Sequence, residues 1–192
     1  FGSGQLATTM RSLASVLPAF KSLGYKRQVF LLNWGSFDTH TGQRGSDANS
    51  QDTQFDALAR ALEWLVASDV PVVNMSLAGP RNAILDRLIT QSVARGTLIV
   101  AAAGNGGPNA PPAYPAALRP VVAVTAVDAR QRVYRYANQG EYITVAARGV
   151  DEPAADPTGG VSRYSGTSFA TPHVAAWLAR CLVDSGAAAC AR

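Results

Sequence analysis

The segment from Val70 to Ala103 constrains the fold more than any other part of the sequence. An apolar run at 70–75 is followed by residues with helical spacing, and Gly96 then precedes a second apolar run at 97–103. Glycine suits the left-handed cap that ends many helices. Two strands joined by a helix and short connections form a parallel βαβ unit, whose crossover is right-handed. The chain is therefore predicted to be an α/β protein.

The flanking sequence continues the alternation of helices and strands. Apolar residues at helical spacing predict three more helices, at 6–20, 55–65 and 170–182. Apolar runs predict three more strands, at 28–34, 121–127 and 142–146. Pro18 should kink or end the first helix, Pro172 is expected in the first turn of the last one, and the polar residues 35–52 predict a long loop. The expected architecture has three layers, with a mostly parallel sheet flanked by helices.

Composition narrows the classes of protein to which the chain can belong. The 192 residues are 47% hydrophobic and 16% charged, which supports a buried core and argues against intrinsic disorder. No apolar run approaches the roughly 20 residues of a membrane helix. The net charge of +4 is spread along the chain, with Lys26-Arg27 as the only adjacent basic pair. We therefore expect neither a membrane nor a nucleic acid as a partner.

The two cysteines, Cys181 and Cys190, leave two interpretations open. Their spacing differs from the Cys-x-x-Cys of zinc sites, and the chain has two histidines, so no metal or other cofactor is expected. A disulfide across 182–189 is one interpretation for an oxidising compartment. Two unrelated thiols are the other.

Two segments carry features that an acyl-transfer site needs. Ligands of parallel sheets bind beyond the carboxyl ends of the strands, and Gly104–Gly107 directly follows the strand at 97–103, with the amide of Asn105 among its glycines. Ser168 opens the last helix, where free backbone N–H groups and the helix dipole surround its hydroxyl. A nucleophilic serine needs such oxyanion donors and also a base. On the residues alone, a helix cap at Ser168 and a turn at Asn105 remain the simpler interpretations.

Three segments resemble motifs of the subtilisin-like serine proteases. Residues 164–176 (YSGTSFATPHVAA) resemble the nucleophile motif, 72–80 (VVNMSLAGP) the substrate-binding strand, and 100–106 (VAAAGNG) the oxyanion segment. They occur in the order of the family, and the residues after the third motif, including Tyr114-Pro115, are also similar. The resemblance covers about residues 55–183. It implies a subtilisin-like fold that is incomplete at its N-terminal side.

The resemblance also implies a role for each matched residue. Ser168 corresponds to the nucleophile and Asn105 to the oxyanion donor. An extended peptide would pair with a strand made of Ser76, Leu77, Ala78 and Gly79. The side chain before the scissile bond would enter a pocket lined by Ala102, Gly104 and Ala113. These small residues favour a large apolar or aromatic group, and the implied partner is a polypeptide substrate in the extracellular or periplasmic space.

The aspartate and histidine motifs of that family are not found in this sequence. His173 lies in the nucleophile motif, at a position that is not catalytic in the family. His40 lies in the predicted loop, two residues from Asp38, and side by side these two do not form a relay in which the aspartate supports the imidazole. Residues 1–7 align weakly with the histidine motif, which would place Phe1 where the base should be. Otherwise the chain would begin past that motif, as a processed or excised piece.

Residues 28–43 carry a second resemblance, to an uncharacterised bacterial family related to sulfatases and alkaline phosphatases. On that interpretation Asp38 and His40 would be a pair of metal ligands, although no further ligand cluster follows them. The chain would then join an N-terminal segment, 1–54, to the C-terminal part of a peptidase domain, 55–192.

Three functional hypotheses follow. The first is a serine endopeptidase that hydrolyses peptide bonds through an acyl-enzyme on Ser168. The second is a catalytically incomplete relative or fragment that acts at most as a peptide-binding scaffold. The third, a metal-dependent ester hydrolase, depends on Asp38 and His40 alone. Elsewhere, Asp151-Glu152 with Asp156 is interpreted as an exposed acidic turn in preference to a calcium loop, because prolines interrupt it.

Overall fold

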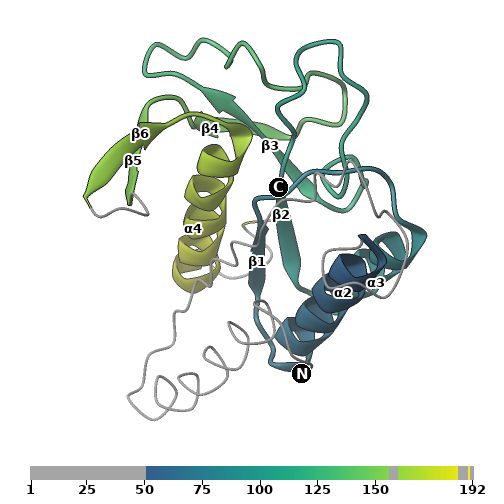
Figure 1. Cartoon of the computed structure of the whole chain (residues 1–192). Helices are drawn as coiled ribbons and strands as arrows, with labels where there is room; N and C mark the ends of the chain where they lie inside the picture. Colours follow the sequence, from purple (N-terminus) through teal and green to yellow (C-terminus); the bar gives the residue numbers. More distant parts are fainter. Residues whose placement is uncertain (1–50, 156–159, 186–189, 191–192) are drawn as a thin grey trace.

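The computed structural model describes residues 51–155, 160–185 and 190 (Figure 1). In chain order the elements are α2 (Gln51–Ala67), β1 (Val72–Met75), α3 (Ala83–Ala94), β2 (Leu98–Ala102), β3 (Val122–Val127), β4 (Val145–Arg148), β5 (Glu152–Ala155), β6 (Val161–Tyr164) and α4 (Thr167–Ser185). The helix expected at 6–20, the strand expected at 28–34 and the Asp38–His40 pair lie outside the described residues.

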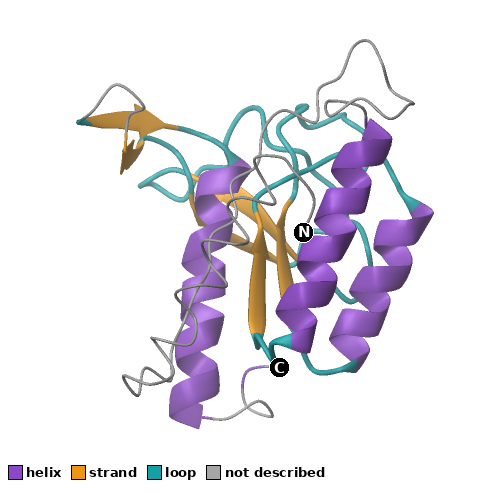
Figure 2. Ribbon diagram, turned by 60° about the horizontal axis from the view of Figure 1, so that its bottom comes forward, coloured by secondary structure: helices purple, strands orange, loops and turns teal. Residues whose placement is uncertain are grey.

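Strands β1 to β4 form a parallel sheet in that order, with Val73 beside Ile99, Ala101 beside Ala123 and Thr125 beside Ala146. Helices α2 and α3 cover one face of the sheet and α4 covers the other (Figure 2). The predicted three-layer α/β architecture is confirmed.

Successive residues of each central strand point to opposite faces, so each strand contributes to two apolar layers. Val73 and Ile99 pack toward α2 and α3, whereas Val72 and Val100 pack toward α4. A strand buried on both faces needs apolar side chains at nearly every position. This requirement explains the apolar runs from which β1 to β3 were predicted, which Asn74 and Thr125 interrupt as buried polar residues.

Helix α3 is capped at both ends, and its end lies where the sequence predicts it. The Asn82 side-chain oxygen accepts hydrogen bonds from the backbone N–H groups of Ile84 and Leu85, both at 3.0 Å. At the other end Gly96 has a φ of +94°, and its N–H donates to the Val93 carbonyl at 2.9 Å. This left-handed cap turns the chain into β2 and confirms the expectation for Gly96.

Two predicted boundaries were wrong. The last strand of the sheet was expected at 142–146 but begins at Val145. Tyr142 instead packs on the α2–α3 side of the sheet, and its hydroxyl donates to the Ala103 carbonyl at 2.8 Å. The strand was predicted to begin too early because Tyr142 is apolar and packs on the sheet without belonging to β4, whose own residues are mostly exposed. The loop expected to extend to residue 52 gives way to α2 at Gln51.

The acidic turn expected around Asp151 is largely a strand. β5 pairs antiparallel with β6, and this hairpin lies beside α4 (Figure 1). Glu152 lies 3.1 Å from the Arg148 guanidinium and 3.5 Å from the His173 imidazole. Its carboxylate therefore ties the hairpin to β4 and α4. Asp156 lies outside the described residues.

Two kinds of feature are absent from the described part of the chain. None of its helices is long and apolar enough to cross a membrane. Within the same residues, His, Cys, Asp and Glu side chains form no group of three or more that could hold a metal ion.

The two cysteines form a disulfide, which settles the alternative left open by the sequence. Cys181 and Cys190 have Cα atoms 5.9 Å apart. Both belong to the apolar layer between the sheet and α4. The cross-link therefore fastens residues beyond α4 back onto the core.

We expect removal of this disulfide to destabilise the fold. A closed loop spanning nine positions contributes about 2–3 kcal/mol to the free energy of unfolding on the chain-entropy model. Urea unfolding with and without a thiol reductant measures the difference. The Cys181→Ala/Cys190→Ala variant is the control, since its midpoint should not respond to the reductant. Equal stability of the oxidised and reduced wild-type chain would contradict the prediction.

Candidate active site

The end of β2 and the start of α4 meet at Thr167, which is fully buried. The backbone N–H of Gly104 donates to the Thr167 hydroxyl at 3.2 Å. The Asn105 side-chain oxygen accepts from the Thr167 N–H at 2.9 Å and from its hydroxyl at 3.2 Å. Three hydrogen bonds therefore join two segments that lie more than 60 residues apart in the sequence.

These hydrogen bonds fix the orientation of the Asn105 amide. Its oxygen faces Thr167, so its nitrogen is the end that remains to donate. That nitrogen lies 3.3 Å from the position that a Cβ would occupy on Gly166. Asn105 is exposed, and its nitrogen donates to none of the described residues. The arrangement presents an amide donor to solvent, next to the backbone that leads into Ser168.

Ser168 lies inside the first turn of α4 and is half-buried. Because the helix already begins at Thr167, Ser168 is not the residue that precedes the helix. The simple interpretation of Ser168 as a helix cap therefore does not hold. The N–H groups of a first helical turn face the region around its side chains, which favours a developing negative charge there.

Pro172 lies deeper in α4 than predicted, beyond the first turn. A proline inside a helix has no N–H to donate to the carbonyl four residues earlier, which here belongs to Ser168. The Ser76 hydroxyl donates to that carbonyl instead, at 2.9 Å. Ser76 in turn accepts a hydrogen bond of 3.0 Å from the Asn74 amide, at the end of β1. The serine segment is therefore attached to β1 as well as to β2.

The expected substrate-binding residues follow β1 directly. Gly79 exchanges two backbone hydrogen bonds of 2.9 Å with Tyr114 in an antiparallel bridge. The preceding backbone, at Leu77 and Ala78, forms no hydrogen bond with another described segment. Backbone groups left unpaired in this way are available to pair with a peptide, as the sequence predicts for these residues.

The three residues expected to line a pocket are partly brought together. The Ala113 Cβ lies 3.1 Å from the position of a Cβ on Gly104, so these two residues are in contact. Ala102 is buried at the end of β2. Gly104 has a φ of +104°, and a side chain there would meet the Asn138 amide at 2.7 Å. Only glycine fits this position.

Asn138 and Thr167 are positioning residues that the sequence did not reveal. Asn138 is buried, and its side-chain oxygen accepts from the Gly106 N–H at 2.7 Å. Its own N–H donates to the Gly104 carbonyl at 3.0 Å. The loop around Asn105 is therefore held from both sides. The sequence carries no signal for this role, because Asn138 is in a polar turn more than 30 residues away.

The described residues supply a candidate nucleophile, an amide donor and a candidate peptide-binding edge. The Ser168 hydroxyl has no hydrogen-bond partner among them. His173 contacts Glu152 from a later turn of α4. His40, the other histidine of the sequence, lies outside the described residues.

Comparisons with known proteins agree with this arrangement. A model of the subtilase family matches residues 14–185. Subtilisin from Bacillus pumilus is 34% identical over 126 residues, which is 64% of this chain and 46% of that protein. Subtilisin E from Bacillus subtilis is equally similar over 64% of this chain and 33% of its own length.

Solved structures give the same result. A cold-adapted subtilisin-like serine proteinase matches with a TM-score of 0.64 and 29% identity, over 69% of this chain and 49% of that one. The prenylagaramide maturation protease PagA matches with a TM-score of 0.61 and 33% identity, over 66% and 48%. This chain spans about a third to a half of the length of these relatives. From the family match and the agreement in fold, we conclude that the chain belongs to the subtilase family.

Proposed function

We propose that this chain is the part of a serine endopeptidase that carries the nucleophile and the oxyanion donor. Ser168 would form the acyl-enzyme and Asn105 would stabilise the oxyanion. The observation that carries the proposal is the junction at Thr167, because it places a free amide donor beside the serine-bearing turn. The subtilase relatives support the same reaction class.

In this mechanism a polypeptide substrate pairs with the backbone of Ser76–Gly79, which brings its scissile carbonyl to Ser168. The Ser168 oxygen attacks the carbonyl carbon while a base removes the hydroxyl proton. The carbonyl oxygen becomes negatively charged and accepts a hydrogen bond from the Asn105 amide. The leaving amine takes the proton from the base, and water then hydrolyses the acyl-enzyme. The small residues Ala102, Gly104 and Ala113 would accept a large apolar side chain before the scissile bond.

No described residue contacts the Ser168 hydroxyl as a base would, and His40 is the candidate base that remains in this sequence. A peptide-binding scaffold without turnover is the second candidate function. It is favoured by one observation, the absence from the sequence of the aspartate and histidine motifs of the family. For the location we propose the extracellular or periplasmic space. The disulfide supports an oxidising compartment.

A fluorophosphonate probe distinguishes the two functions, because it reacts only with a serine whose hydroxyl is activated. We expect the wild-type chain to be labelled and Ser168→Ala to lose the label. Ser185→Ala, which changes an exposed serine at the end of α4, is the control and should keep it. A folded wild-type chain that remains unlabelled would leave the scaffold as the function.

Asn105→Ala should slow labelling of the folded chain, and it should also lower the unfolding midpoint because the buried Thr167 N–H loses its acceptor. The labelling rate should fall by a factor on the order of 10²–10³, which is the size of the loss in kcat when the oxyanion asparagine of subtilisin is removed. Asn109→Ala, which changes an exposed asparagine in the same loop, is the control. The comparison uses labelling rates at equal protein concentration. A rate unchanged by Asn105→Ala would remove this residue from the mechanism.

Thr167→Val should disturb the site through its hydrogen bonds while keeping the shape of the side chain. The change leaves the buried Gly104 N–H without its acceptor, which costs about 1–3 kcal/mol. It also removes one of the two donors that orient Asn105. We therefore expect slower labelling of Ser168 together with a lower unfolding midpoint. Thr167→Ser retains the hydroxyl and should restore the labelling rate, whereas a purely structural role would leave labelling of the folded fraction unaffected.

A further inference from the structure

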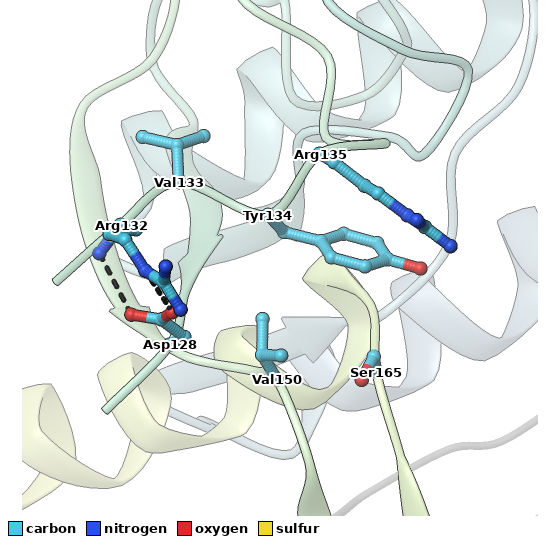
Figure 3. A pocket seen from close by; sticks show the side chains of 7 residues that line it. All are labelled: Asp128, Arg132, Val133, Tyr134, Arg135, Val150 and Ser165. Atoms are coloured by element: carbon cyan, nitrogen blue, oxygen red, sulfur yellow. Dashed lines mark hydrogen bonds and ion pairs between the residues drawn. The ribbon is translucent and has the colours of Figure 1, made fainter. Parts of the chain in front are cut away.

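A cavity of about 490 Å³ lies beside the segments that hold the active site (Figure 3). One wall comes from the loop that follows β3, and the opposite wall contains Val150 and Ser165. Ser165 comes shortly before the turn that carries Ser168, and its hydroxyl accepts from the Asp151 N–H at 3.0 Å. The cavity therefore adjoins the start of α4.

The other wall is connected to the loop that carries Asn105. Arg135 lines the cavity, and the next residue, Tyr136, accepts a hydrogen bond of 2.8 Å from the Gly107 N–H. The same segment continues to Asn138, which holds Gly106. One wall therefore continues into the turn that carries Ser168, and the other is hydrogen-bonded to the loop that carries Asn105.

The acidic group of the cavity is already neutralised. One Asp128 oxygen accepts from the N–H groups of Arg130 and Arg132, at 2.8 and 2.9 Å. The other accepts from the Arg132 guanidinium at 2.7 Å. The backbone hydrogen bond from Arg132, above all, holds the pKa of Asp128 below its ordinary value. Asp128 and Arg132 thus form a closed pair at one end of the cavity.

Because Asp128 is paired with Arg132, Arg135 is a cation of the cavity lining without a carboxylate partner among the described residues. Its guanidinium carbon lies 4.5 Å from the centre of the Tyr136 ring, which is packed edge-to-face with Tyr134 at 5.6 Å. Among the described residues it contacts no carboxylate. Arg135 and Tyr134 extend in the same direction along one wall, with Val150 and Ser165 opposite the Tyr134 ring (Figure 3). An exposed guanidinium, a phenol and apolar walls together fit a carboxylate on an aliphatic stem.

We propose that this cavity binds an acidic side chain of the polypeptide substrate. The substrate residue that carries it is not one of those that pair with Ser76–Gly79. The carboxylate would contact Arg135 and the Tyr134 hydroxyl, and its methylene groups would pack against Val150. The identity of the ligand as substrate rests on the proposed function, because one wall leads into the Ser168 turn and the other is hydrogen-bonded to the Asn105 loop. The cavity itself would distinguish glutamate from glutamine by charge.

Peptide binding to the Ser168→Ala variant tests this proposal without turnover. A peptide series carries one Glu at each position along an extended sequence, and a matched series carries Gln at the same position. We expect one position at which Glu binds about tenfold more tightly than Gln, as for a charge-assisted hydrogen bond. Arg135→Gln should abolish that preference. Arg130→Gln is the matched control, since Arg130 belongs to the same loop and is exposed but does not line the cavity.

Each other outcome overturns the proposal. If Glu and Gln peptides bind with equal affinity at every position, the cavity does not discriminate by charge. Equal losses in Arg130→Gln and Arg135→Gln would show only a general effect of positive charge. Displacement of the Glu peptide by excess acetate, with no dependence on peptide position, would indicate a site for small carboxylates and not for substrate. Fluorophosphonate labelling is a separate readout, so the proposed endopeptidase function and the cavity proposal can fail independently.

Discussion

The buried hydroxyl of Thr167 is the contact on which the candidate site depends. β2 ends at Ala102, and the Gly104 N–H just beyond it must find an acceptor in the interior. Thr167 supplies that acceptor and uses its own N–H and hydroxyl to hold Asn105. One side chain thus satisfies a strand end and orients an amide donor. Any displacement of α4 from the sheet would break all three hydrogen bonds at once.

Pro172 removes a hydrogen bond within α4, and a contact with a distant segment replaces that bond. Pro172 removes the helical donor from the Ser168 carbonyl, and an isolated helix would be weakened there. In the folded chain the Ser76 hydroxyl takes the vacant position. The segment expected to bind peptide and the segment that carries the serine are therefore joined by a hydrogen bond that an uninterrupted helix would not need.

The arrangement of the parallel sheet explains why these contacts are possible. Adjacent parallel strands release their carboxyl ends at the same edge, so the residues after β1 and β2 emerge side by side. α4 packs across the opposite face from α2 and α3 and begins at that edge. Gly149 permits the approach, since a Cβ there would lie 2.7 Å from the Gly166 carbonyl. The site forms where the segments after β1 and β2 meet the start of α4, and short polar side chains join them by hydrogen bonds.

The sequence by itself determined the α/β class and the elements buried on both faces, because continuous apolar runs and the glycine at Gly96 depend only on local rules. It placed the start of β4 too early, since the apolar residue Tyr142 packs against the sheet without belonging to the strand. Its motifs also indicated Ser168 and Asn105 as a pair. Only the tertiary structure decided that the Asn105 nitrogen, and not its oxygen, remains available as a donor. It also decided that Asn138 binds the loop around Asn105, and that Arg135 has no carboxylate partner among the described residues. Those outcomes depend on hydrogen bonds and charges between residues far apart in the chain, which no local pattern records.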